Sequence, residues 1–179
     1  IIPVTGLVFA AGGGEDMSQE LASIGRVRLS SEQVSDLLER NKNYFPELEG
    51  EAARLWREAT IDRENLFGSL SRHLQARHGV RVTIRTVAEM KGAVRRYDAP
   101  RRELSLSEVL RRGSRNFQLA HQIGLLECGE TLDRIAADQY LTTDESRSLA
   151  RVALASYFAS AVLMPYDDFF EAAEQLRYD

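Results

Sequence analysis

Apolar residues recur every three to four positions along residues 31–79, the spacing that places them on one face of an α-helix. We predict three helices there. The first starts near Ser31, and Pro46 opens the second. Asp62 can cap the third, which ends at Gly79. Four residues share the apolar face of the second helix: Leu48, Ala52, Leu55 and Trp56.

The period changes at residues 80–87, where apolar and polar residues alternate. Alternation of this kind is typical of a half-buried strand. Two more short strands are predicted at 92–98 and 102–107, separated by a turn at 98–101. The middle of the chain therefore predicts a small three-stranded sheet.

Helical patterns return after the strands. A helix over 114–128, with Ser114 as its cap and Gly129 after its end, carries apolar residues around its whole circumference, which is typical of a buried helix. We predict further helices over 131–140, 142–164 and 166–179. The helix at 142 begins with the Thr-x-x-Glu pattern of a capping box.

Helices, then a small sheet, then helices predict a helix-rich α+β fold with the sheet packed on the central helix. We interpret residues 1–29 as an irregular linker and 30–179 as one domain. The chain starts without methionine and stops within a helical pattern, so we expect a piece of a longer protein.

The charge is distributed unevenly. Residues 72–115 carry 12 basic against 4 acidic side chains, a net charge of +8, whereas 1–71 and 116–179 are acidic. Such a basic stretch indicates an anionic partner; a solvated sheet face whose arginines pair with the acidic flanking segments fits equally well. Eight arginines are candidates: Arg72, Arg77, Arg81, Arg85, Arg95, Arg96, Arg101 and Arg102.

Cys128 is the only cysteine, which excludes a disulfide framework or a cysteine-based metal site in this chain and fits a cytoplasmic protein. No run of residues reaches the roughly 18 apolar positions that a membrane-spanning helix needs.

The segment FQLAHQIGLLE (117–127) is similar to a metallopeptidase motif without its chemistry. In His-Glu-x-x-His, both histidines reach one zinc ion and the glutamate is the general base. Here His121 keeps the first position, Gln122 replaces the glutamate, and Leu125 replaces the second histidine. The segment predicts no peptidase activity and no metal.

The order of elements resembles the ImmA/IrrE-type zinc metallopeptidase domain. In that family a third ligand, a glutamate, precedes a phenylalanine by four residues. Phe158 matches this phenylalanine, so Leu154 stands at the ligand position. The resemblance implies a metallopeptidase-like fold without an intact zinc site. His121 is then either an ordinary core histidine or part of a cavity that holds another guest.

A narrower family, the short-chain fatty acyl transcriptional regulators, is similar over roughly 30–179. The matching segments are RNKNYFPELE (40–49), HLQARHGVRV (73–82), RRYDAPRREL (95–104), FQLAHQIGLLE (117–127) and the long run 145–179. Some members regulate the methylcitrate and glyoxylate cycles for propionate and acetate. In this family a helix-turn-helix binds DNA, a middle domain binds acyl-CoA, and a C-terminal region carries cysteines.

The resemblance implies that this chain is the middle, ligand-sensing domain of a bacterial regulator, with CoA or a short-chain acyl-CoA as its effector. DNA binding would belong to a helix-turn-helix outside this chain, and any iron–sulfur cluster to a C-terminal region outside it. We expect no membrane partner and a homodimer, because regulators of palindromic operators are usually dimers. The alternatives are a structural or dimerisation domain without a ligand, and a residual hydrolase.

Coenzyme A presents an adenine, several phosphates and a thin arm, and candidate residues follow from these groups. Asn43 could bind the pantetheine amides, and Tyr44 or Tyr97 could stack on the adenine, although such aromatic residues more often pack in the core. His121 and Gln122 would line the old cavity, and Tyr157 and Phe158 its acyl end; packing is the alternative for these two as well. The candidate phosphate ligands are Arg40, Lys42, Arg72, Arg81, Arg85 and Arg96.

Overall fold

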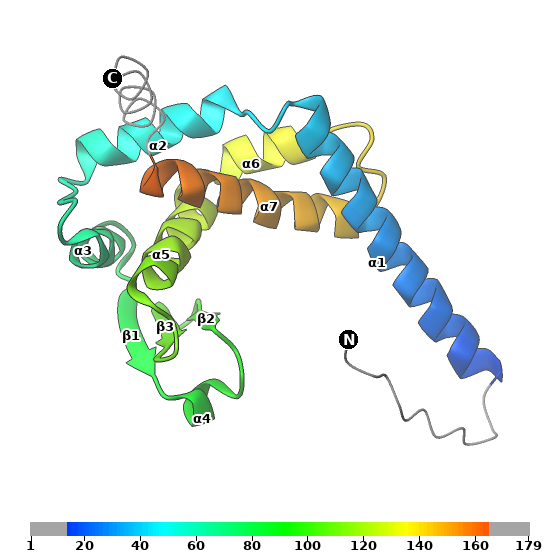
Figure 1. Cartoon of the computed structure of the whole chain (residues 1–179), viewed down its shortest axis with the longest axis horizontal. Helices are drawn as coiled ribbons and strands as arrows, with labels where there is room; N and C mark the ends of the chain where they lie inside the picture. The colour runs from blue at the N-terminus through cyan, green and yellow to red at the C-terminus, as the bar shows by residue number, and fades with distance from the viewer. Residues whose placement is uncertain (1–13, 165–179) are drawn as a thin grey trace, which may run out of the picture.

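A computed structural model describes residues 14–164 of the protein (Figure 1). Seven helices and three strands lie within that range. The helices are α1 (Gly14–Arg40), α2 (Pro46–Glu58), α3 (Leu66–His78), α4 (Val87–Met90), α5 (Arg112–Glu127), α6 (Gly129–Ala136) and α7 (Asp144–Leu163). The strands are β1 (Arg81–Arg85), β2 (Arg95–Asp98) and β3 (Glu103–Ser107). The predicted helix-rich α+β fold is confirmed.

Helix α1 begins at Gly14, so the prediction of an irregular segment was wrong for residues 14–29. The helix therefore does not start near Ser31, and Ser30 is buried within it, with its Oγ 3.4 Å from Oγ1 of Thr143 before α7. This contact lies where the second half of α1 packs against α7, and the helix continues toward the N-terminus away from the other helices (Figure 1). The domain boundary at residue 30 stays a prediction, and residues 1–13 and the expected helix at 166–179 lie outside the described range.

The three predicted strands form one sheet in the order β1-β3-β2, with β3 parallel to β1 and antiparallel to β2. Leu104 and Leu106 of β3 are fully buried in the main core. Thr83, Glu103 and Ser105 hydrogen-bond to one another on the other face. Alternating residues therefore separate a core-facing side of the sheet from a polar outer side.

Helix α5 is the centre of the core, as its pattern predicts. It packs on α7 and α3, and Leu119, Ala120 and Ile123 are fully buried. A Cβ added at Gly124 would meet Cδ1 of Phe158 at 2.7 Å. The missing side chain at Gly124 is therefore what lets α7 approach α5 this closely.

Several helix ends differ from the predictions by a few residues. Asn65, not Asp62, caps α3, and Thr143 with Ser146 forms the capping box of α7 one residue after the predicted position. Helix α5 begins after Arg111, and Gly129 starts α6. The short helix α4 was not predicted. Adjacent polar residues can all serve as caps, and the surrounding packing decides among them.

Replacing Asn65 with alanine should lower the free energy of unfolding by about 1 kcal/mol, because the N-cap side chain is lost. The Asn65 Oδ1 accepts a 3.1 Å hydrogen bond from the Gly68 N–H. Asp62→Ala is the control, since the Asp62 carboxylate accepts from the Glu64 N–H before the helix, and its loss should cost less than about 0.5 kcal/mol. Chemical denaturation measures both, and equal losses would contradict the assignment.

None of the helices within residues 14–164 combines the length and the apolar character needed to cross a lipid bilayer.

Candidate functional site

The site is built around His121, which α5 holds in the core with 4% of its surface exposed. Arg95 reaches it from β2 and donates a hydrogen bond from Nη1 to His121 Nδ1. Arginine stays protonated in proteins, so Nδ1 must be the acceptor and a neutral ring carries its proton on Nε2. A backbone hydrogen bond to Val152 of α7 completes the environment of the ring.

Burial lowers the pKa of His121 to about 4, and the positive charge of Arg95 acts in the same direction. The backbone hydrogen bond to Val152 opposes both effects but is weaker. His121 is therefore neutral near pH 7 and can act as a hydrogen-bonding residue but not as a cation.

The residues around His121 do not fit the zinc ion of a metallopeptidase. Leu125 and Leu154 stand where the second and third ligands would be, and Leu154 is fully buried among other apolar side chains. Gln122 is buried at 3% exposure and cannot serve as a general base at neutral pH. The Nδ1 of His121 already accepts the bond from Arg95. One histidine with these neighbours cannot form a catalytic zinc site.

Arg95 is the charged residue of this site, and it is half-buried without a carboxylate partner in the described part of the chain. Burial lowers its pKa, and in the described part of the chain no carboxylate lies within ion-pair distance of it. The Oε1 of Gln122 is also buried without a hydrogen-bond partner among the described residues. A half-buried guanidinium without an acid can receive an anion.

The outer face of the sheet carries the predicted basic cluster, but its charges are paired. Arg81 and Arg85 both bind Glu103, at 3.3 and 2.9 Å, and Arg85 also lies 3.5 Å from Glu89. The hydrogen bond from Arg85 is the main cause that lowers the pKa of Glu103. Arg96 donates to the Met90 carbonyl at 3.1 Å. A phosphate role for Arg81, Arg85 and Arg96 stays a prediction.

A shallow pocket of about 290 Å³ opens on this outer face. Three arginines and three acids line it, so its side-chain charges cancel. The lining residues are Arg85, Glu89, Met90, Arg96, Asp98, Arg101, Glu103 and Ser105. The arginines pair with acids here, as the second alternative for the basic stretch expected, but these acids come from the stretch itself and not from the acidic flanks.

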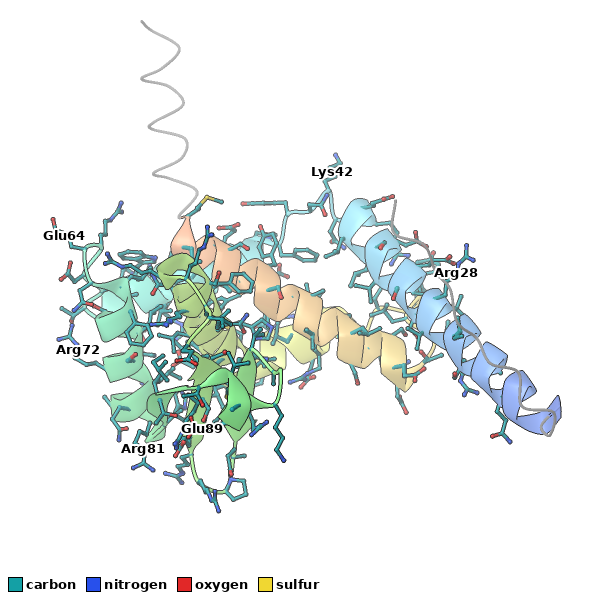
Figure 2. All side chains as sticks on the ribbon, turned by 60° about the horizontal axis from the view of Figure 1, so that its bottom comes forward. Arg28, Lys42, Glu64, Arg72, Arg81 and Glu89 are labelled. Carbon is teal, nitrogen blue, oxygen red and sulfur yellow. The ribbon has the colours of Figure 1, made fainter. Side chains whose placement is uncertain are left out.

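The candidates at residues 40–44 lie at the end of α1 and in the turn after it, well apart from the sheet, as the labelled Lys42 and Arg81 show in Figure 2. Arg40 forms a 3.0 Å ion pair with Asp138 and stacks over Tyr140. Three further candidates are exposed in this turn: Lys42, Asn43 and Tyr44. One ligand-binding surface does not include both groups in this conformation.

The aromatic candidates point in different directions. The Tyr157 hydroxyl donates to Glu49 Oε1 at 2.5 Å and accepts from the Phe45 N–H at 3.3 Å, so this ring faces α2. Burial and then this carboxylate raise the pKa of Tyr157 to about 12. Phe158 is 1% exposed in the core, and Tyr97 packs against the same core. These contacts favour a structural role for the three residues, and their part in binding CoA stays a prediction.

Arg72 also lies outside the His121 site. It donates hydrogen bonds to the Gly68 carbonyl and the Ser69 hydroxyl, both at 3.3 Å and both within α3. Figure 2 shows it on the outer side of that helix.

Sequence reasoning overlooked two features. Arg95 was one of eight candidate arginines and was not selected, although strand alternation places it on the face opposite Arg96. The second feature joins His73, His78 and Glu127, which the structure brings together from α3 and α5. The presence of His73 and His78 in the sequence was a signal, but their approach to Glu127 was not predictable.

Comparisons with known proteins agree with this geometry. A family model described as the IrrE N-terminal-like domain (Peptidase_M78) matches residues 75–179, more than half of the chain. A solved structure described as a Mycobacterium tuberculosis transcriptional regulator matches with a TM-score of 0.77 and 35% identity, over 84% of this chain and 45% of that one.

Three curated relatives are regulators by name. The HTH-type transcriptional regulator RamB of Mycobacterium tuberculosis is 32% identical over 94% of this chain and 35% of its own length. The HTH-type transcriptional regulator PrpR of the same species is 35% identical, over 83% of this chain and 30% of its own. A propionyl-CoA carboxylase regulator of Cereibacter sphaeroides is 38% identical, over 42% of this chain and 16% of its own length.

The chain spans about a third of the length of the first two of these relatives. The resemblance found in the sequence is confirmed at the level of the family. By its sequence match and its fold, the chain belongs to the IrrE N-terminal-like domain family.

Proposed function

We propose that this domain senses CoA or a short-chain acyl-CoA for a bacterial transcriptional regulator of propionate or acetate metabolism. The similarity to RamB, PrpR and a propionyl-CoA carboxylase regulator supports a regulatory role and an acyl-CoA effector. The regulator would act in the cytoplasm as a homodimer, and its DNA contacts would come from a helix-turn-helix outside this chain. The replaced zinc ligands support a binding domain over a hydrolase.

Arg95 is the observation that carries this proposal. A half-buried guanidinium whose only hydrogen-bond partner in the described residues is the neutral His121 is a ready partner for a phosphate of CoA. Arg81 and Arg85 would first have to leave Glu103 to bind the same group. We therefore place Arg95 ahead of the outer-face arginines as the phosphate ligand.

Binding at Arg95 would change the conformation of the domain. Arg95 lies on β2, an edge strand of the sheet, and its guanidinium contacts α5 through His121. An anion that takes over Arg95 breaks this link between sheet and helix. An effector shifts the balance of two conformations by binding one of them better, which is what a sensing domain requires.

Thermal unfolding with CoA, acetyl-CoA and propionyl-CoA tests the proposal. A ligand at 100 times its dissociation constant should stabilise the domain by about 2.7 kcal/mol. Arg95→Gln should weaken binding by about 10- to 100-fold, since a hydrogen bond to a charged group contributes about 1.5–3 kcal/mol. Titration calorimetry measures the affinity.

Two further variants sharpen this test. Arg28→Gln, at an exposed arginine on α1, is the matched control and should leave affinity unchanged. The double variant Arg81→Ala with Arg85→Ala tests the outer face. A loss of binding in the double variant, with none in Arg95→Gln, would move the phosphate site to the outer face. The sensing proposal fails if none of the three compounds changes the melting temperature.

The alternative, a structural or dimerisation domain, has one observation in its favour. Helix α1 exposes Ile24 and Val27, at 59% and 55%, one helical turn apart on its protruding half. Under this alternative, Ile24→Glu with Val27→Glu would convert a dimer to a monomer in analytical ultracentrifugation, while CoA compounds would have no effect on the melting temperature.

A further inference from the structure

Two histidines of α3 and a glutamate of α5 meet in a second polar cluster, which does not include His121. Nε2 of His73 lies 2.5 Å and Nε2 of His78 lies 2.8 Å from the same Glu127 Oε1. The ligand-capable atoms of the three residues all lie within 4.8 Å of one another. Their side chains are 10%, 21% and 8% exposed.

The atoms that converge here are those that bind a divalent transition metal. Two imidazole nitrogens and a carboxylate oxygen form a common ligand set for zinc, which binds each at about 2.0–2.2 Å. A metal between the three residues would require ligand atoms roughly 3 Å apart, so the two nitrogens would have to withdraw from Glu127 by less than 1 Å. Side-chain rotation supplies such a shift.

Two nearby residues, Arg54 and Cys128, do not compete with a metal ion for the three ligand atoms. Arg54 of α2, the neighbouring cation, is held by Glu51 and Glu58. Cys128 follows Glu127 directly but is 2% exposed in the apolar core, and it is not among the converging residues. The cluster therefore offers two nitrogens and an oxygen, and His78 is its most exposed member.

We propose that His73, His78 and Glu127 bind a divalent transition metal of the zinc class. This site is separate from the position of the peptidase zinc. Glu127 follows His121 by six residues on α5, about 9 Å along the helix axis, so one ion cannot be shared between them. The proposal does not depend on CoA binding.

A metal at this position joins the ends of two helices. His78 is the last residue of α3, and Glu127 is the last residue of α5. Since β1 begins three residues after His78, the ion also fixes the start of the sheet. We expect a structural role, in which the metal holds the sheet against α5.

Cobalt titration of the metal-free full chain provides the direct test. Co²⁺ bound by two nitrogens, an oxygen and one water molecule in tetrahedral geometry gives visible absorption bands that are much stronger than those of the hydrated ion. One equivalent of Co²⁺ should bind, and Zn²⁺ should displace it. Zn²⁺ at 100 times its dissociation constant should also raise the melting temperature by about 5–10 °C.

Variants of the three histidines test which residues bind the metal. His73→Gln and His78→Gln should each weaken Co²⁺ binding by more than about 100-fold, and circular dichroism checks that they fold. His121→Gln removes the third histidine of the chain and should keep the cobalt bands. Loss of the bands in His121→Gln alone would overturn the assignment. Their absence in the unaltered protein, which requires no variant, would show that the cluster is a hydrogen-bonded clamp only.

Discussion

Replacing Phe158 with alanine is expected to lower the free energy of unfolding by about 3–5 kcal/mol, the usual effect of removing a buried aromatic ring. Phe158 is 1% exposed and lies against Gly124, at the contact between α7 and α5. Neither helix can close the resulting cavity without leaving its other partners. Urea denaturation measures the change.

This result would decide between two roles for Phe158. A residue that walls an acyl pocket would change the preference between acetyl-CoA and propionyl-CoA and cost little stability. Val152→Ala is the control on α7, because Val152 is 49% exposed and should cost less than about 0.5 kcal/mol. A loss below about 1 kcal/mol in Phe158→Ala would contradict the core assignment.

Gly124→Ala tests the same contact from α5. It should lower the free energy of unfolding by about 1–3 kcal/mol, because the added methyl group overpacks the contact with Phe158.

The second large effect is a loss of folding stability at low pH, caused by the protonation of His121. Between pH 7 and pH 5 the titration of His121 should remove about 2 kcal/mol of stability, approaching about 3 kcal/mol near pH 4. The folded pKa of His121 is about 4, below its ordinary value of 6.5. The unfolded chain therefore binds the proton first as the pH falls. Protonation favours the unfolded state through this window, and the full loss is reached below pH 4.

The difference between the unaltered protein and His121→Gln isolates this titration, because other acids and histidines are common to both. Urea denaturation at each pH should give a steeper decline for the unaltered protein between pH 7 and pH 5. Arg95→Gln removes the nearby positive charge, so the pKa of His121 should rise and the decline should become shallower. Parallel curves for all three proteins would show that His121 is not the buried neutral residue of the structure.

The elements of the fold could be predicted where the signal is local. The alternation at residues 80–87 and the helical period around Leu48 and Leu55 depend on a few neighbouring residues, and each gave the correct element. The start of α1 could not be predicted this way. Ser30 and Ser31 have the sequence of a cap, and only the packing of Ser30 near Thr143 shows that the helix continues through them.

The candidate site was predicted in part. His121 and Gln122 are buried beside each other on α5, as the motif indicated. The outer-face arginines were found, but their partner was not, because Glu103 approaches Arg81 and Arg85 only through the pairing of β1 with β3. The residues of the turn at 40–44 lie apart from the sheet, which no spacing in the sequence could show (Figure 2).

The sequence by itself determined the kind and order of most elements, since the helical and strand periods depend only on residues that are close together along the chain. It also determined that the zinc ligands are replaced, because Leu125 and Leu154 cannot bind a metal wherever they lie. Only the tertiary structure decided which arginines of the described residues pair with a carboxylate. Arg81 is paired across the sheet, whereas Arg95 turns inward to His121.

The same distinction applies to the second cluster. His73 and Glu127 are 54 residues apart, and they meet because α3 packs on α5. Charge and ligand chemistry depend on distances of a few ångströms between atoms from remote segments. Periodicity along the chain carries no information on those distances, and they are set only when the helices and the sheet pack together.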